Sequence, residues 1–204
     1  MVSTKKALKQ LEELRKLGHI MRLAAEEWDE PWQTLISIML SARTRDETTI
    51  NVCNRLFKRY KTVKSLSKAS LKDIQKMIYS VNFYKNKSKS VFRCSKELVS
   101  KYNGKVPHDF DKLVELPGVG RKTANVFLSE FGKDHIGVDT HVDYISHYLG
   151  WTKGKNQEQV ENDLKRLFPR RYWKIVNPIL VRFGKTHRSR RKENELLDKI
   201  KRIK

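Results

Sequence analysis

The chain has 204 residues, and its 44 lysines and arginines outnumber its 23 aspartates and glutamates, which gives a formal net charge of +21. Such a charge suits a polyanionic partner, and DNA, RNA and acidic membrane surfaces all qualify. No run approaches the roughly 18 apolar residues of a membrane span, and charged residues interrupt the N-terminus where a secretory signal would be apolar. We therefore expect a soluble protein of a reducing intracellular compartment, the cytoplasm or nucleoid, with enough apolar residues (38%) for one large or two small cores.

Hydrophobic periodicity predicts helices along almost the whole chain. Leucines 8, 11, 14 and 17 recur at helical spacing, and the apolar face around Leu35 and Ile36 predicts a central buried helix. Further helices are expected near 46–60, 70–79, 86–102, 110–115, 122–131, 140–149, 156–167 and 171–183. No stretch alternates with the period of a strand, so the predicted fold class is all-α.

The basic C-terminal segment 192–203 carries Leu196, Ile200 and Ile203 on one helical face. This stripe favours a last helix that docks on the protein. The alternative is a solvated or disordered basic tail.

The run Leu116-Pro117-Gly118-Val119-Gly120-Arg121 is the most informative motif. Pro117 fixes one backbone angle, while Gly118 and Gly120 permit positive φ and leave no Cβ in the way of a ligand. Helical spacing begins near Arg121, so the glycines precede a helix N-terminus, which favours a phosphate. The motif predicts DNA backbone contacts from Gly118, Val119, Gly120 and Arg121, although glycine loops also punctuate many folds for steric reasons.

Lys122 and Asp139 are the candidate catalytic pair. Lys122 lies in the first turn of the predicted helix, where the dipole and Arg121 disfavour a second charge, and a neutral amine is a nucleophile. The seven residues 132–138 span at most roughly 25 Å, so the chain can return Asp139 to Lys122. Asp139 also precedes an apolar-periodic run, which is the position of a helix N-cap. From these residues alone, a phosphate contact for Lys122 and capping for Asp139 are the ordinary roles.

Taken together, these motifs resemble endonuclease III and the wider helix-hairpin-helix DNA glycosylase superfamily. The resemblance rests on Met39-Leu40-Ser41-Ala42, on 81–87, on 103–107, on the glycine motif, and on Gly137-Val138-Asp139-Thr140-His141. It implies a helix-hairpin-helix motif at about 110–131 and two helical domains with a DNA-binding cleft between them. A six-helix domain is expected at 27–135, and a second domain is expected from 1–26 and 136–204.

The same resemblance implies a bifunctional DNA glycosylase/AP lyase of base excision repair. Lys122 would attack C1′ of the damaged nucleotide and Asp139 would assist, with double-stranded DNA carrying a damaged base or abasic site as partner and a monomeric enzyme. Oxidised pyrimidines of the thymine glycol type are the expected substrates. Oxidised guanine, mismatched thymine or uracil, a non-catalytic hairpin module and an RNA-binding protein are the alternatives.

The cysteines depart from that family, in which a four-cysteine loop commonly holds an iron–sulfur cluster after the last core helix. Here Thr186-His187-Arg188-Ser189-Arg190-Arg191 occupies that place, and the chain has two cysteines, Cys53 and Cys94. Neither a cluster nor a zinc site can be built from this pair, so we expect no cluster, no transition metal and two reduced core thiols. An alkali cation on hairpin carbonyls, as in this superfamily, stays open because main-chain ligands leave no trace in a sequence.

Two loops supply further candidates for DNA contact. Phe83 stands where the family often has a leucine wedge and would fill the space of a flipped nucleotide, although it is equally readable as a core aromatic. Arg43 stands where the family has a glutamine opposite the lesion, and it can donate two hydrogen bonds to guanine or pair with Asp46. Asp46 itself is expected to cap the following helix. Candidate phosphate contacts complete the set: Arg45, Lys85 and Lys87.

Overall fold

The computed structural model describes residues 2–204, and in that range it is helical without a β-strand. It divides into two compact units, Arg22–Leu128 and Met1–Met21 with Ser129–Lys204. Both boundaries lie a few residues before those expected at 27 and 135. No helix within 2–204 has the length and apolar character needed to cross a membrane.

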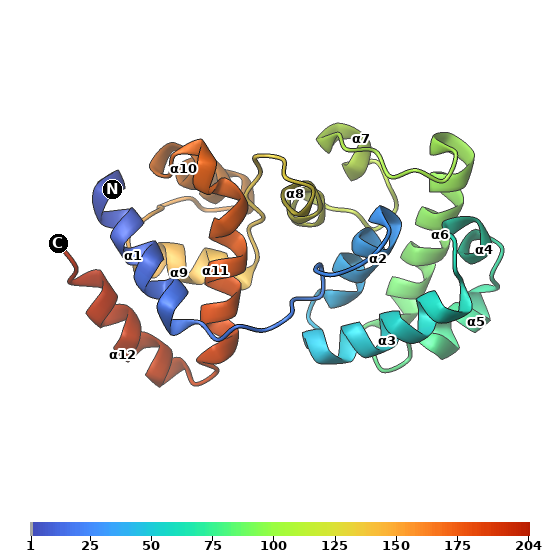
Figure 1. Cartoon of the computed structure of the whole chain (residues 1–204), viewed down its shortest axis with the longest axis horizontal. Coiled ribbons are helices and arrows are strands. Elements are labelled where there is room, and N and C mark those ends of the chain that lie inside the picture. The colour runs from blue at the N-terminus through green and yellow to red at the C-terminus, as the bar shows by residue number, and fades with distance from the viewer. Residues whose placement is uncertain (1) are drawn as a thin grey trace. The chain divides into compact units, whose positions relative to one another are not determined.

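The unit Arg22–Leu128 is built around α2 (Pro31–Ser41), which is buried along almost its whole length. Helix α2 packs against α3 (Asp46–Arg59) and α6 (Tyr84–Tyr102), and α4 (Val63–Ser67) and α5 (Leu71–Met77) lie against α6 (Figure 1). Helices α7 (Phe110–Val114) and α8 (Arg121–Glu130) form the hairpin. The unit holds one helix more than the six expected because the five-residue α4 was not predicted.

The unit Met1–Met21 with Ser129–Lys204 packs α1 (Thr4–Leu17) along α11 (Trp173–Thr186), as Figure 1 shows. Helix α9 (Thr140–Tyr148) lies against α11 and α10 (Gln157–Leu167), and a short 3-10 turn, Arg170–Tyr172, precedes α11. The largest core side chains of this unit are Trp151, Phe168 and Phe183, all fully buried. Helix α9, which carries one of the candidate catalytic residues at its start, buries Val142 and Ile145 in this unit.

The C-terminal segment forms α12 (Arg190–Lys201), which packs on α1. The docked helix is therefore confirmed, and the disordered tail is excluded. The predicted face was wrong by part of a turn, however. The buried apolar residues of α12 are Leu197 and Ile200, whereas Leu196 and Ile203 are only half-buried.

Both cysteines belong to the unit Arg22–Leu128, with Cys53 on α3 and Cys94 on α6. Both side chains are buried, and burial raises the pKa of each thiol to about 12. A thiol with such a pKa is protonated at neutral pH and is a poor metal ligand or nucleophile. Their predicted role as core thiols fits this environment.

Candidate active site

The hairpin turn between α7 and α8 depends on Gly118. Its φ is +83°, and a Cβ at this position would lie 2.5 Å from Cβ of Ser90 and 3.0 Å from Cε of Met39. Glycine is therefore required both for the left-handed backbone and for close packing onto α6 and α2. Gly120 differs, because its φ is not positive and a Cβ there would meet nothing within 4 Å. The open side of Gly120 thus leaves room for an approaching ligand.

Val119 is buried, with 4% of its surface exposed, and its N–H donates to the carbonyl of Leu116 at 3.0 Å. The predicted DNA contact of Val119 is therefore not supported by its geometry, since both its side chain and its N–H are used inside the unit. Arg121 lies with its guanidinium carbon 5.0 Å from the ring centroid of Phe110, which links the first turn of α8 to α7. Lys122 follows as the second residue of α8 and is half-buried.

Lys87 on α6 is also half-buried, and its ammonium is already engaged by oxygen atoms. It donates to the carbonyls of Leu40 at 2.7 Å and Ala42 at 2.5 Å, and to Oγ1 of Thr44 at 3.1 Å. The phosphate contact predicted for Lys87 is therefore replaced by a structural role at the carboxyl end of α2. Burial, with a smaller contribution from the charge of Lys122, lowers the pKa of Lys87 to about 8. The two ammonium groups are thus close enough for their charges to repel each other.

Two loops of this unit are joined around Arg43 and Phe83. Both residues adopt left-handed backbone, with φ of 56° and 59°, and the guanidinium carbon of Arg43 lies 4.8 Å from the centroid of the Phe83 ring. The side chain of Asn82 donates to the carbonyl of Arg43, and its N–H donates to Oγ1 of Thr44 at 3.2 Å. Phe83 is 54% exposed, which excludes the reading as a core aromatic.

The remaining predictions near this loop separate into two groups. Arg45 and Lys85 are exposed, as phosphate contacts require. The capping role predicted for Asp46 is wrong, because Arg45 is the N-cap of α3 and Asp46 is the first residue of the helix. An acidic residue still suits that position, since the first turn of a helix attracts negative charge.

Asp139 belongs to the other unit and is the N-cap of α9. Its Oδ1 accepts from the N–H of His141 at 3.0 Å and from the N–H of Val142 at 2.9 Å. Both bonds go to the same oxygen, so capping uses one of the two carboxylate oxygens. The segment before it is tied by Asn177, whose buried side chain donates to the carbonyl of Gly137 at 2.7 Å. The capping reading is confirmed, and the partly exposed carboxylate keeps an oxygen for chemistry.

The donor set of the chain does not fit a four-cysteine iron–sulfur cluster. No cysteine follows Cys94 in the sequence, and His187, which stands at the end of α11, lies with Nε2 3.0 Å from the carbonyl oxygen of Leu17. Within residues 2–204, no group of three histidine, cysteine or acidic side chains is arranged to hold a metal ion.

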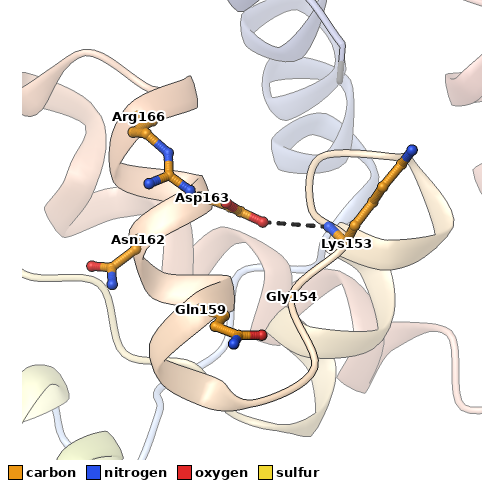
Figure 2. A pocket seen from close by; sticks show the side chains of 6 residues that line it. All are labelled: Lys153, Gly154, Gln159, Asn162, Asp163 and Arg166. Carbon is orange, nitrogen blue, oxygen red and sulfur yellow. Dashed lines mark hydrogen bonds and ion pairs between the residues drawn. The ribbon is translucent and has the colours of Figure 1, made fainter.

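A shallow pocket of about 350 Å³ lies between α10 and the loop that precedes it (Figure 2). Asp163 holds this loop by accepting from the hydroxyl of Thr152 at 2.7 Å and the N–H of Lys153 at 3.4 Å. Its lining is polar and includes none of the residues predicted for the site: Lys153, Gly154, Gln159, Asn162, Asp163 and Arg166. The pocket is thus a feature of the α10 surface and is separate from the candidate catalytic residues.

Comparison with known proteins decides the family. Residues 36–170, more than half of the chain, match the model of the HhH-GPD superfamily base excision DNA repair protein. The chain belongs to the HhH-GPD superfamily. It is 43% identical to endonuclease III of Thermotoga maritima over 157 residues, which cover 76% of this chain and 74% of the relative. It is 38% identical to endonuclease III of Bacillus subtilis over 185 residues, which cover 88% and 84%.

Solved structures of endonuclease III with DNA are similar to this chain over most of its length. The trapped endonuclease III–DNA covalent intermediate has a TM-score of 0.84 at 34% identity, over 93% of this chain and 89% of that one. A non-covalent endonuclease III–DNA complex has a TM-score of 0.82 at 34% identity, over 91% and 87%. The all-α fold is therefore confirmed. This chain is a DNA-binding base excision repair glycosylase with AP lyase activity.

Proposed function

We propose that the enzyme removes oxidised pyrimidines of the thymine glycol type from double-stranded DNA, with Lys122 as nucleophile and Asp139 assisting. The observation that carries this proposal is the position of Lys122. It lies in the first turn of α8, directly after a hairpin turn that is locked onto α6 and α2 through Gly118. The ammonium of a second lysine, Lys87, is near enough to interact with it electrostatically.

The proposed reaction begins when the amine of Lys122 attacks C1′ and the bond from C1′ to the base breaks, with its electron pair leaving on the base. Asp139 accepts the proton that the amine releases. The C1′–O4′ bond then breaks and O4′ takes up the proton held by Asp139, which opens the sugar ring and leaves a protonated Schiff base between Lys122 and C1′. A water molecule removes a C2′ proton, the electron pair forms a C2′–C3′ double bond, and the 3′ phosphate leaves, so that this β-elimination nicks the strand. Water then hydrolyses the Schiff base and releases Lys122.

DNA contact is proposed for the backbone at Gly118 and Gly120, for Arg121, and for the exposed side chains of Arg43, Arg45, Phe83 and Lys85. Flipping a nucleotide out of the duplex costs a few kcal/mol, and an inserted aromatic side chain offsets part of that cost. Phe83 is suited to this insertion because its side chain is exposed and its ring packs against the guanidinium group of Arg43. We propose that the enzyme acts as a monomer on DNA inside the cell.

We also propose that the enzyme works without an iron–sulfur cluster. The support is the donor set, since the two cysteines are buried on α3 and α6 with a pKa of about 12. Any metal at the hairpin would be an alkali cation on main-chain carbonyls. Protein from iron-rich medium should contain far less than one iron per chain and should keep its activity after chelation. A stoichiometric iron content would contradict the proposal.

The decisive experiment is borohydride trapping on duplexes that carry thymine glycol, 8-oxoguanine, uracil opposite guanine, or a preformed abasic site. We expect a covalent complex with thymine glycol and with the abasic site, and none with Lys122→Ala. Lys89→Ala is the matched control, because Lys89 is exposed on α6 of the same unit, and it should trap normally. Trapping by Lys122→Ala would refute the nucleophile, and preferential trapping on 8-oxoguanine or uracil would assign the substrate to those lesions instead.

A further inference from the structure

Two side-chain hydrogen bonds, one helical turn apart, join α9 to α12. The hydroxyl of Tyr144 donates to Oδ1 of Asn194, and one turn later the hydroxyl of Tyr148 donates to Oδ1 of Asp198 at 2.8 Å. Each tyrosine ring also faces a cation of α12. The guanidinium carbon of Arg190 lies 3.7 Å from the centroid of Tyr144, and the ammonium of Lys201 lies 5.3 Å from that of Tyr148.

Helix α12 also carries a buried carboxylate, that of Glu193. Glu193 of α12 is 4% exposed and accepts from Arg190 at 2.8 Å through Oε2, while its Oε1 has no hydrogen-bond partner within residues 2–204. Burial raises the pKa of Glu193, and the charges of Arg190, His141 and His187 oppose that shift. His141 is itself packed onto the backbone of α11, because a Cβ on Gly184 would overlap its Nδ1 atom. His141, two positions after the Asp139 cap, is thus packed on α11.

The far end of α12 is fixed as well. The buried side chain of Gln10 on α1 donates to the carbonyl of Ile200 at 3.2 Å and accepts from Nε1 of Trp151 at 2.7 Å. Leu197 and Ile200 are buried against the same core. Helix α12 is therefore anchored to the core of its unit independently of the two tyrosine hydrogen bonds, so that it can serve as a fixed support for α9.

We propose that α12 positions Asp139, and that Asn194 and Asp198 are positioning residues for base removal. The proposal rests on the proposed role of Asp139. Helix α9 has nine residues, and helices below about 12 residues are marginal on their own. The orientation of its N-cap carboxylate must come from neighbouring elements.

The test removes the hydroxyl groups of the two tyrosines and keeps their aromatic rings. Tyr144→Phe/Tyr148→Phe deletes two hydroxyl groups, and Tyr172→Phe is the control, since Tyr172 precedes α11 and stacks on Arg171 instead of α12. We expect single-turnover removal of thymine glycol to slow about tenfold, because a misplacement of about 1 Å can cost a hundredfold. DNA affinity and trapping on a preformed abasic site should not change, because Lys122 and the proposed DNA contacts all lie in the unit Arg22–Leu128.

Rescue separates positioning from general destabilisation. Asn194→Leu lacks the acceptor for Tyr144 and should slow base removal, whereas Asn194→Asp keeps the acceptor and should retain the normal rate. Hydrogen exchange of the His141 and Val142 amides, which donate to Asp139, should accelerate in the double tyrosine variant. Faster exchange with unchanged base removal would overturn the proposal, and so would an equal loss of base removal and abasic-site trapping. If Asp139→Asn itself removes bases normally, the proposed role of Asp139 fails, while the exchange result still reports whether α12 orders α9.

Discussion

Nζ of Lys87 lies 2.7 Å from the carbonyl oxygen of Leu40, so a lysine from α6 closes the carboxyl end of α2. The same ammonium holds Ala42 and Thr44, which flank Arg43 in its left-handed backbone. A cation at the end of a helix compensates the dipole and satisfies carbonyls that have no partner within the helix. Lys87 thereby couples the loop that presents Arg43 to the helix that supports the hairpin.

The first prediction concerns the stability that Lys87 contributes as pH changes. Its pKa falls from 10.5 to about 8 on folding because it is buried, with Lys122 adding to the effect. Between these values the unfolded chain holds a proton that the folded chain has lost, so stability rises with pH in this window. The contribution is fully present above pH 10.5 and is lost as the pH falls through 8.

The measurement is the free energy of unfolding of the wild type and Lys87→Met at several pH values from 7.5 to 10.5. The wild type should gain stability relative to the variant as the pH rises. Lys85→Met is the control, because Lys85 is exposed two positions earlier on α6, and its difference from the wild type should stay constant. Parallel curves for the wild type and Lys87→Met would show that Lys87 has the same proton affinity in both states.

The second prediction separates the two glycines of the hairpin. Gly118→Ala must place a Cβ at a φ of +83° and against Ser90, and the backbone strain alone should cost about 1–3 kcal/mol of folding stability. Gly120→Ala has open space and should stay within about 0.5 kcal/mol of the wild type. If the backbone at Gly120 faces DNA, the added methyl group should weaken DNA binding about tenfold, or about 1.4 kcal/mol.

Thermal unfolding and DNA titrations of the two variants check this pair. The expected pattern is a stability defect for Gly118→Ala and a binding defect without a stability defect for Gly120→Ala. Normal DNA binding by Gly120→Ala would remove Gly120 from the proposed contact surface, and an unaltered stability of Gly118→Ala would contradict the packing onto α6.

The hairpin glycines also illustrate what the sequence could predict. Both were expected to serve a ligand, yet only the structure separates a packing glycine from an open one, because Ser90 and Met39 are distant in sequence. The long helices were readable since apolar residues recur along several turns, as in α2. The five-residue α4 buries Val63 and Leu66, which is too little for a periodic signal. Asp139 was readable as a cap because the pattern of α9 begins directly after it.

Other site features depend on contacts that composition does not reveal. Lys87 resembles any surface lysine in the sequence, since its partners are main-chain carbonyls more than 40 residues away. The left-handed backbone of Arg43 and Phe83 was equally unpredictable, because neither residue type favours it. The register of α12 was missed because Leu196 and Leu197 are adjacent, and only docking on the core decides which one is buried.

The third prediction tests Phe83 as the side chain that fills the space of the flipped nucleotide. Phe83 is 54% exposed and stacked on Arg43, and Tyr79, which is 68% exposed in the same unit, provides a matched aromatic control. Base–aromatic stacking contributes about 1–3 kcal/mol per base. Phe83→Ala should therefore slow base removal from a lesion-containing duplex by about tenfold or more, whereas Tyr79→Ala should have little effect.

Single-turnover excision by both variants from duplex and single-stranded substrates provides the measurement. In single-stranded DNA the target base has no partner and leaves no gap in a duplex, so the defect of Phe83→Ala should shrink there. Phe83→Leu, which keeps an apolar side chain of similar reach, should recover much of the duplex activity. An equal defect on both substrates would mean that Phe83 supports the Arg43 loop rather than filling the gap in the duplex. An equal defect in Tyr79→Ala would mean that losing any exposed aromatic side chain of this unit impairs activity, which would contradict a specific role for Phe83.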